Sequence, residues 1–180
     1  MTYYGAKHLA DAFRTVRTNT ITIAEEIAAD QYGFRPAPGV RTVGELLAHI
    51  AVMPRWQMAA HGERRTFIDF EYFGRSVARA AGEEQLLRTK EEILQALREG
   101  GEQFASFLAG LSEESLAETV EFPPPVTPSA KSRFEMLLSA KEHEMHHRGQ
   151  LMLIQRQLGM VPHMTRARQA FAAQAAGAPR

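Results

Sequence analysis

The sequence predicts an all-α protein, a four-helix bundle with one long connection between its second and third helices. Apolar residues recur every three or four positions in four segments, which is the pattern of amphipathic helices. Three of these segments begin with a capping box, a Ser or Thr followed three residues later by Glu. About 28 residues separate the second segment from the third, more than a direct turn between neighbouring helices needs. The helices are expected at residues 4–29, 42–60, 89–109 and 132–158, followed by a C-terminal tail at 160–180, all in a single domain of residues 1–180.

A loop rich in helix breakers separates the first two helices. The first helix places Leu9, Phe13, Val16, Ile23 and Ile27 on one face. Residues 31–41 then contain two glycines and two prolines, which end one helix before the next begins. Thr42 and Glu45 form the first capping box. The inward face of the second helix carries Leu46, His49, Ile50 and Met53, and Pro54 is expected to kink or end the helix because proline lacks an amide donor.

The connection to the third helix is long enough to cross the bundle. One shorter helix is expected within it, around Phe70 to Ala81. The third helix starts at the second capping box, Thr89 to Glu92, and contains Gly100 and Gly101 in its middle. Each glycine costs about 1 kcal/mol relative to alanine in a helix interior. Packing against other helices must therefore stabilise this segment.

Proline determines the structure between the third and fourth helices. Residues 112–116 can form one helical turn. Residues 118–128 contain three consecutive prolines, so they cannot be helical and are expected to be extended or polyproline-like. A short helix is expected in the tail after Pro162.

The fourth helix shows the clearest signal and also an anomaly. It begins at the third capping box, Ser132 to Glu135, and Gly159 supplies its C-terminal stop. The inward positions are Met136, Ala140, His143, His147, Leu151, Ile154 and Leu158. Two histidines therefore occupy positions where a bundle normally places apolar side chains.

The spacing of these histidines suits a metal ion. Residues four apart on a helix have Cβ atoms about 5 to 6 Å apart, so His143 and His147 can turn their rings toward one point. A zinc-type catalytic site commonly takes three protein ligands, and His49 is the candidate third ligand because it also interrupts an apolar face. The alternative is that these are core or helix-surface histidines bonded to carbonyl groups, and for His49 alone this is the simpler interpretation. His146 lies about 100° around the helix from His147, so it is either a surface neighbour or a group that supports a ligand or moves a proton.

Three carboxylates lie close to these histidines in the sequence. Glu45 precedes His49 by one helical turn and could orient its ring, although the capping role already accounts for this residue. Glu142 and Glu144 flank His143, and each is either a base or a solvated charge, the solvated charge being the simpler interpretation.

Composition excludes several classes of function. Lys plus Arg and Asp plus Glu both number 21, so the formal net charge is zero, which disfavours a nucleic-acid partner. Cysteine is absent, so disulfides and thiolate ligands are excluded and any metal must bind nitrogen or oxygen. The N-terminus lacks the features of a signal peptide and no stretch approaches 18 apolar residues, so we expect a cytoplasmic protein without a membrane partner.

Two motifs resemble those of a known family. Residues 142–151, EHEMHHRGQL, resemble the C-terminal signature of the DinB family, also called DinB/YfiT-like. Residues 42–49, TVGELLAH, fit the family's pattern around a histidine on its second helix. The resemblance extends from the first helix to Gly159. It implies a four-helix bundle with up-down-down-up connectivity and a long crossover between helices two and three.

The resemblance also implies a site and a chemistry. In the DinB family the corresponding histidines ligate a divalent metal, which carries over to His49, His143 and His147. Relatives often replace the residue at His146 by an aromatic one, which places it outside the ligand set. Characterised relatives include transferases and isomerases in which the metal activates a low-molecular-weight thiol, and relatives often form homodimers.

Three hypotheses follow for the function. The first is a zinc- or nickel-dependent enzyme that activates a low-molecular-weight thiol, an S-transferase acting on a small-molecule substrate; the thiol must diffuse in because the chain has no cysteine. The second is a metal-dependent hydrolase that activates water, with Glu142 or Glu144 as base. The third is a non-catalytic, stress-related protein that binds a metal or small ligand, and a homodimer is compatible with any of the three.

Overall fold

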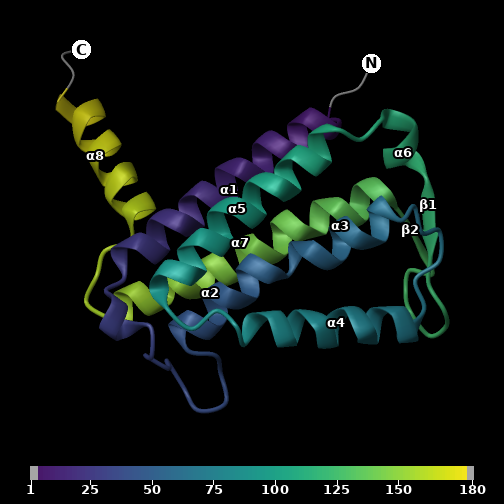
Figure 1. Cartoon of the computed structure of the whole chain (residues 1–180). Helices are drawn as coiled ribbons and strands as arrows, with labels where there is room; N and C mark the ends of the chain where they lie inside the picture. Colours follow the sequence, from purple (N-terminus) through teal and green to yellow (C-terminus); the bar gives the residue numbers. More distant parts are fainter. Residues whose placement is uncertain (1–3, 178–180) are drawn as a thin grey trace.

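The computed structural model describes residues 4–177 and shows a helical bundle with one small two-stranded sheet (Figure 1). The order of elements is α1 (Ala6–Glu26), the 3-10 turn η1 (Ala29–Gln31), α2 (Val43–Val52), α3 (Pro54–Gly62), α4 (Phe70–Glu84), α5 (Lys90–Ala109), α6 (Glu113–Ala117), β1 (Thr119–Glu121), β2 (Ala130–Ser132), α7 (Arg133–Gln157) and α8 (His163–Gly177). Within this part of the chain, no helix is both long enough and apolar enough to span a membrane.

Four helical rods form the bundle: α1, α2 continued by α3, α5, and α7. In Figure 1, α1 and α7 run in one direction, while α2 with α3 and α5 run in the other. Helix α4 carries the chain back along the molecule from the end of α3 to the start of α5. The connectivity is therefore up-down-down-up with a long crossover, as the sequence predicted.

Capping boxes start three of the helices at the predicted positions. The Thr42 side chain accepts a hydrogen bond from the Glu45 amide, and the Glu45 carboxylate accepts one from the Thr42 amide at 2.7 Å. The same reciprocal pair starts α5 at Thr89 and α7 at Ser132. The predicted helix at 42–60 is instead two helices that meet at Met53, because Pro54 cannot donate an amide and occupies the first position of α3.

The crossover helix α4 is longer than the predicted segment, Phe70 to Ala81. Asp69 caps its start by accepting a hydrogen bond from the Tyr72 amide at 2.6 Å. The helix continues through Gly82, which solvent-exposed helices tolerate, and ends at Glu84. The additional turn brings Glu84 against α2.

A short hairpin follows α6, where the sequence predicted an extended or polyproline-like segment. Strands β1 and β2 pair antiparallel, with Val120 opposite Lys131. Val120 is fully buried and packs with Ile68, Tyr72 and Met136, which holds the hairpin against the bundle. The three residues of β2 carry no apolar alternation, so their pairing was not visible in the sequence. The expected helix after Pro162 is α8, and residues 178–180 of the predicted tail lie outside the described part of the chain.

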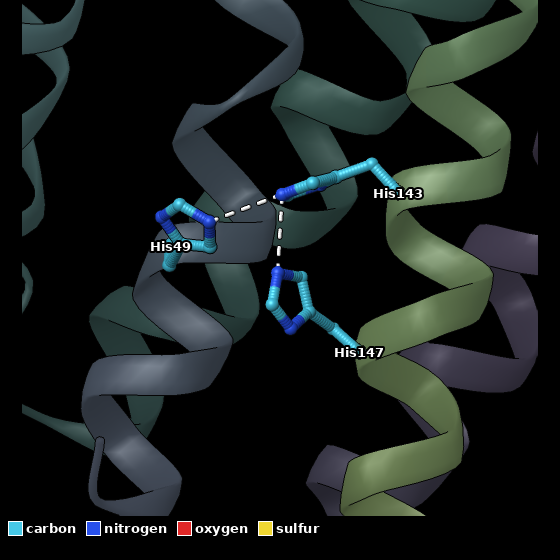
Figure 2. A group of neighbouring side chains, drawn as sticks. All are labelled: His49, His143 and His147. Atoms are coloured by element: carbon cyan, nitrogen blue, oxygen red, sulfur yellow. Dashed lines mark hydrogen bonds between the residues drawn. The ribbon is translucent and has the colours of Figure 1, made fainter. Parts of the chain in front are cut away.

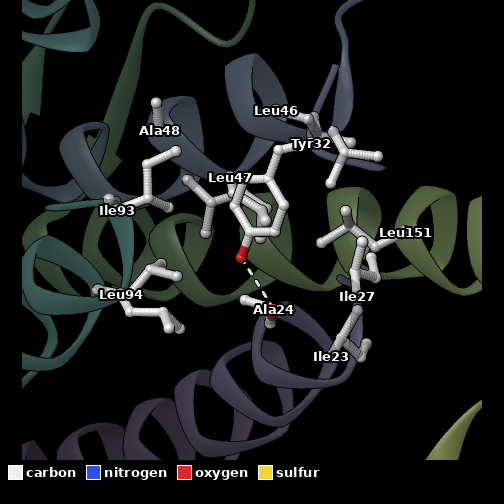
Figure 3. Close-up of a cluster of buried hydrophobic side chains, with 14 of the residues drawn as sticks. Ile23, Ala24, Ile27, Tyr32, Leu46, Leu47, Ala48, Ile93, Leu94 and Leu151 are labelled. Atoms are coloured by element: carbon white, nitrogen blue, oxygen red, sulfur yellow. Dashed lines mark hydrogen bonds between the residues drawn. The ribbon is translucent and has the colours of Figure 1, made fainter. Parts of the chain in front are cut away.

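A buried cluster at one end of the bundle fixes the position of α2 (Figure 3). It includes Ile23 of α1 and Ile27 directly after it, Leu47 of α2, Ile93 and Leu97 of α5, and Leu151 of α7. Tyr32 enters this cluster from the loop after η1, and its hydroxyl donates a hydrogen bond to the Ala24 carbonyl at 2.8 Å. Each buried Leu or Ile stabilises the fold by about 1.5 to 3 kcal/mol relative to an exposed one. The cluster thereby holds α2 against α7.

Candidate metal centre

Three histidines from two helices of the bundle converge on one point. His49 lies on α2, while His143 and His147 lie one turn apart on α7. Figure 2 shows the three rings directed toward one another between the two helices. The structure therefore brings together all three residues that the sequence singled out as candidate ligands.

The spacing of the ring nitrogens fits one metal ion. His143 Nε2 lies 3.1 Å from His49 Nε2 and 3.1 Å from His147 Nε2, and the three candidate ligand atoms all lie within 4.8 Å of one another. Two nitrogens that bind one zinc-like ion at about 2.0 to 2.1 Å, at a tetrahedral angle, are about 3.3 Å apart. The residues present thus fit a divalent metal, with a fourth coordination position that these histidines do not supply.

Hydrogen bonds on the outer side of two rings direct their lone pairs to the same point. His49 Nδ1 lies 2.8 Å from Glu84 Oε1, and since a carboxylate only accepts, Nδ1 carries the ring proton. His147 Nδ1 lies 2.8 Å from the Gln150 amide oxygen, which selects the same tautomer. In the neutral form of each ring, Nε2 is then the nitrogen with the free lone pair, and both Nε2 atoms face His143. Metal-ligating histidines are commonly held in this way by an acceptor on the second ring nitrogen.

Burial keeps the two histidines of α7 neutral. Loss of hydration is the main cause that lowers the pKa of His143 to about 4, and the neighbouring imidazoles and Arg41 add to it. Loss of hydration also lowers the pKa of His147, although its hydrogen bond to Gln150 opposes the change. Both rings are consequently neutral at neutral pH, the form in which imidazole binds metals.

A buried ion pair lies next to the histidines on α7. Arg17 of α1 and Glu144 are 3% and 1% exposed. Arg17 Nε lies 2.9 and 3.0 Å from the two carboxylate oxygens, and Nη2 lies 2.9 Å from one of them. Arg17 also donates to the backbone carbonyls of Leu97 and Ile50. Glu144 is thus occupied by an arginine and is not placed to act as a base.

This ion pair accounts for a glycine in the middle of α5. A Cβ atom at position 101 would lie 2.8 Å from Arg17 Cγ, closer than such atoms normally approach, whereas one at Gly100 would lie 3.6 Å from the Ala51 carbonyl. Gly101 therefore leaves the space through which the Arg17 side chain reaches Glu144.

The other predicted site residues do not meet the point where the rings converge. Glu45 completes the cap of α2 and pairs with Arg35, which confirms the capping role that the sequence favoured; the acceptor at His49 Nδ1 is Glu84 instead. Glu142 is exposed on α7. His146 is also exposed; it accepts a hydrogen bond of 3.2 Å from the Gln150 amide, and its ring lies edge-to-face against the ring of His147 with the centroids 5.0 Å apart.

Glu84 is the residue that sequence reasoning missed. It is 35 residues away from His49 along the chain and lies at the end of α4, beyond the helix predicted at Phe70 to Ala81. A carboxylate at a helix end is ordinary in sequence. Only the packing of α4 against α2 shows that this carboxylate holds a histidine.

Two cavities of different character flank the histidines. One, of about 280 Å³, lies beside His143 and is lined mainly by apolar side chains of α2, α3 and α4. The other, of about 750 Å³, lies beside His147 under the loop at residues 31–41, and its lining includes Arg35 and Arg41. The site thus borders an apolar space on one side and a partly cationic space on the other.

A second buried polar group lies at the start of α7, away from the three histidines. Arg133 is fully buried, and its Nε donates to Glu118 at 2.8 Å while its Nη1 donates to His61 Nδ1 at 3.0 Å. Burial, followed by the charge of Arg133, lowers the pKa of His61 to about 4. His61 is thus a neutral acceptor for an arginine and has no neighbouring histidine to form a ligand set.

Comparisons with known proteins agree with this fold and site. The DinB superfamily model matches residues 12–151. A DinB-like protein from Bacillus subtilis, YjoA, is similar with a TM-score of 0.64 at 22% identity, covering 85% of this chain and 92% of that chain. YfiT from Bacillus subtilis, described as "a probable metal-dependent hydrolase with an unusual four-helix bundle topology", is similar with a TM-score of 0.65 at 15% identity, covering 89% of this chain and 91% of that chain. No curated protein matches the sequence. Because the family match spans most of the chain and includes His49, His143 and His147, the chain belongs to the DinB superfamily.

Proposed function

We propose that this protein is a divalent-metal-dependent enzyme in which His49, His143 and His147 hold one ion and a small diffusible nucleophile occupies the fourth position. The observation that carries the proposal is that the Nε2 atoms of three histidines converge on one point. Glu84 and Gln150 support this arrangement, because each accepts a hydrogen bond from the Nδ1 atom of one of these rings. A divalent metal held there would lower the pKa of a thiol or water bound as its fourth ligand.

The protein's own residues prepare this site in three ways. Glu84 and Gln150 hold the rings of His49 and His147 in position. Burial keeps the rings of His143 and His147 neutral at neutral pH. Zinc and nickel are our candidates for the metal, because imidazole nitrogen suits both.

A low-molecular-weight thiol is our first candidate for the nucleophile. The sequence suggested Glu142 or Glu144 as the base for attack by water, but Glu144 is bound to Arg17 and Glu142 is exposed on α7. A thiol with a pKa of about 8.5 needs far less help to ionise than water, whose pKa is about 15.7. The thiol must come from solution because the chain contains no cysteine. The proposed reaction is then transfer of that thiol to a small electrophilic substrate.

Hydrolysis is the second candidate, and one specific observation favours it. YfiT, which shares the fold at 15% identity, is described as a probable metal-dependent hydrolase. In a hydrolase of this kind, the three histidines would carry the same ligand role and water would replace the thiol.

One assay separates these candidates. Protein purified without a histidine tag and loaded with zinc or nickel is mixed with an electrophile panel, with and without cysteine or glutathione as the probe thiol. Loss of free thiol above the buffer rate, abolished in His143→Ala, supports thiol transfer. Ester or amide turnover without thiol supports hydrolysis instead. A protein that binds metal and accelerates neither reaction contradicts the enzymatic proposal and favours a non-catalytic metal-binding role.

A further inference from the structure

The cavity beside His143 is small and has aromatic walls. Its volume is about 280 Å³, and its lining includes Ile50, Met53, Trp56 and Phe73. Binding sites for small molecules usually measure about 300 to 1,000 Å³ and are lined mainly by apolar side chains. This cavity lies just below that range, which suits a ligand with a single ring.

Most of the polar groups that line the cavity already bind one another or another part of the protein. The lining contains one acidic residue, Glu144, and this residue is paired with Arg17. The Gln57 Nε2 group donates to Ser139 Oγ at 3.1 Å, and the Ser139 hydroxyl donates to the Met136 carbonyl at 2.6 Å. The Gln57 side-chain oxygen is buried without a hydrogen-bond partner among the described residues, so it can accept a hydrogen bond from a neutral ligand. A charged ligand would lose its hydration here without gaining an opposite charge, which is costly. The lining therefore favours an uncharged ligand.

Two aromatic rings meet at the cavity in an edge-to-face arrangement. The ring centroids of Trp56 and Phe73 are 5.7 Å apart and the rings are inclined at 87°. Phe73 is 44% exposed, so this large apolar side chain contributes little to the core of the bundle. Aromatic side chains prefer edge-to-face or offset contacts with further aromatic rings. Phe73 is thus available to contact an aromatic ligand.

We propose that this cavity binds the uncharged, single-ring aromatic part of the substrate and so places the reacting group beside His143. Trp56 and Phe73 are the residues that determine this specificity. The role of the ligand as a substrate rests on the proposed function, but its binding in the cavity does not require the metal.

Trp56 provides a direct test, because it is the only tryptophan in the sequence. Its emission is followed while benzyl alcohol, benzoate or benzylamine is added to protein freed of metal with EDTA. These probes have nearly the same size and are neutral, negative and positive at neutral pH. We expect benzyl alcohol to bind at least about tenfold more tightly than either ion. The same preference is expected in His147→Ala, because His147 is a candidate ligand that does not line this cavity.

Two variants of α4 locate the binding. Phe73→Ala is expected to weaken benzyl alcohol binding by about three- to tenfold. Val77→Ala is the matched control, because Val77 is 43% exposed on the same helix and does not line the cavity, and it should leave the affinity unchanged. The proposal is overturned if benzyl alcohol leaves Trp56 emission unchanged, if the ions bind as well as the alcohol, or if both variants behave alike. Benzyl alcohol binding by a protein that takes up no metal would overturn the proposed function while leaving the cavity assignment intact.

Discussion

Helix α7 carries two polar groups on adjacent residues, the half-buried His143 and the buried Glu144, and they differ in whether the protein completes their hydrogen bonding. Glu144 accepts three hydrogen bonds from Arg17, whose remaining donors reach backbone carbonyls. His143 instead faces the Nε2 atoms of His49 and His147, which are both acceptors when these rings are neutral, and its own Nε2 can donate only one proton. The protein alone completes the hydrogen bonding of Glu144, whereas an added cation would complete the group around His143. A buried polar side chain is therefore not enough to identify a functional site. The more informative feature is a set of hydrogen-bond acceptors that face one another and have too few donors among the protein's own groups.

The largest expected effect comes from breaking the ion pair. Glu144→Leu leaves the Arg17 charge buried and unpaired, so the free energy of unfolding should fall by about 3 to 5 kcal/mol. His147→Ala, one turn away on the same helix, should cost no more than about 1 kcal/mol in metal-free protein, because it removes a weak contact between imidazoles. Urea unfolding in the presence of EDTA measures both values.

A double variant provides the control for this prediction. Arg17→Met combined with Glu144→Leu removes both charges and should recover most of the lost stability, because no unpaired charge remains. Equal losses for Glu144→Leu and His147→Ala would show that the two groups do not differ as described.

The next effect concerns the carboxylate that holds His49. Glu84→Ala removes the acceptor on His49 Nδ1, and affinity for zinc should fall by about 10- to 100-fold. Glu45→Ala is the matched control, since Glu45 lies on α2 itself but caps the helix instead of contacting the ring. Competition with a fluorescent zinc chelator compares the two variants. Similar losses of zinc affinity in both would refute the role assigned to Glu84.

Two neighbouring glycines of α5 test whether space for Arg17 is needed. Gly101→Ala places a Cβ 2.8 Å from Arg17 Cγ and should cost about 1 to 3 kcal/mol through overpacking. Gly100→Ala makes only an ordinary contact of 3.6 Å and should be neutral or stabilising by up to about 1 kcal/mol, since alanine favours helix. Thermal unfolding measures the stability of the two variants. A Gly101→Ala variant that is more stable than the wild type would contradict the claim that Gly101 leaves space for the Arg17 side chain.

The smallest effect is a pH dependence that the histidine cluster adds to the metal-free protein. Native His143 takes up a proton near pH 4, whereas an unfolded histidine does so near pH 6.5. The unfolded state therefore binds more protons between these values, and the free energy of unfolding falls as the pH is lowered from 6.5 to 4 but stays level above 6.5. The loss due to His143 is about 1 kcal/mol once screening by water is allowed for.

His143→Ala gives the comparison for this pH dependence. His61 also has its pKa lowered to about 4 and remains in the variant, so part of the slope should persist. Denaturant unfolding at a series of pH values in EDTA measures both slopes. Identical slopes in wild type and His143→Ala would rule out the assigned contribution.

Local signals explain why much of the bundle was predictable from sequence. Capping boxes at Thr42, Thr89 and Ser132 mark helix starts within a few residues, and that information does not depend on the rest of the fold. His143 and His147 stood out because polar residues at inward helix positions are rare, and helical spacing alone places them on one face. The sequence predicted a kink or a helix end at Pro54, but it did not predict that a separate helix, α3, begins there.

The missing features all depend on packing between distant segments. Arg17 and Glu144 are 127 residues apart, and each is an ordinary charged residue in its own helix. Glu84 reaches His49 only because α4 crosses back along α2. The cost of the glycine at position 101 was recognised, but its benefit became visible only with the path of the Arg17 side chain.

Metal content is the most direct test of the central claim that the three histidines form a metal centre. Protein without a histidine tag is analysed by elemental analysis as wild type and as the His49→Ala, His143→Ala, His147→Ala triple variant, with circular dichroism to verify that the variant is folded. We expect about one divalent metal ion per chain in the wild type and none in the folded variant. A wild-type protein that carries no metal and takes up neither zinc nor nickel would contradict the claim.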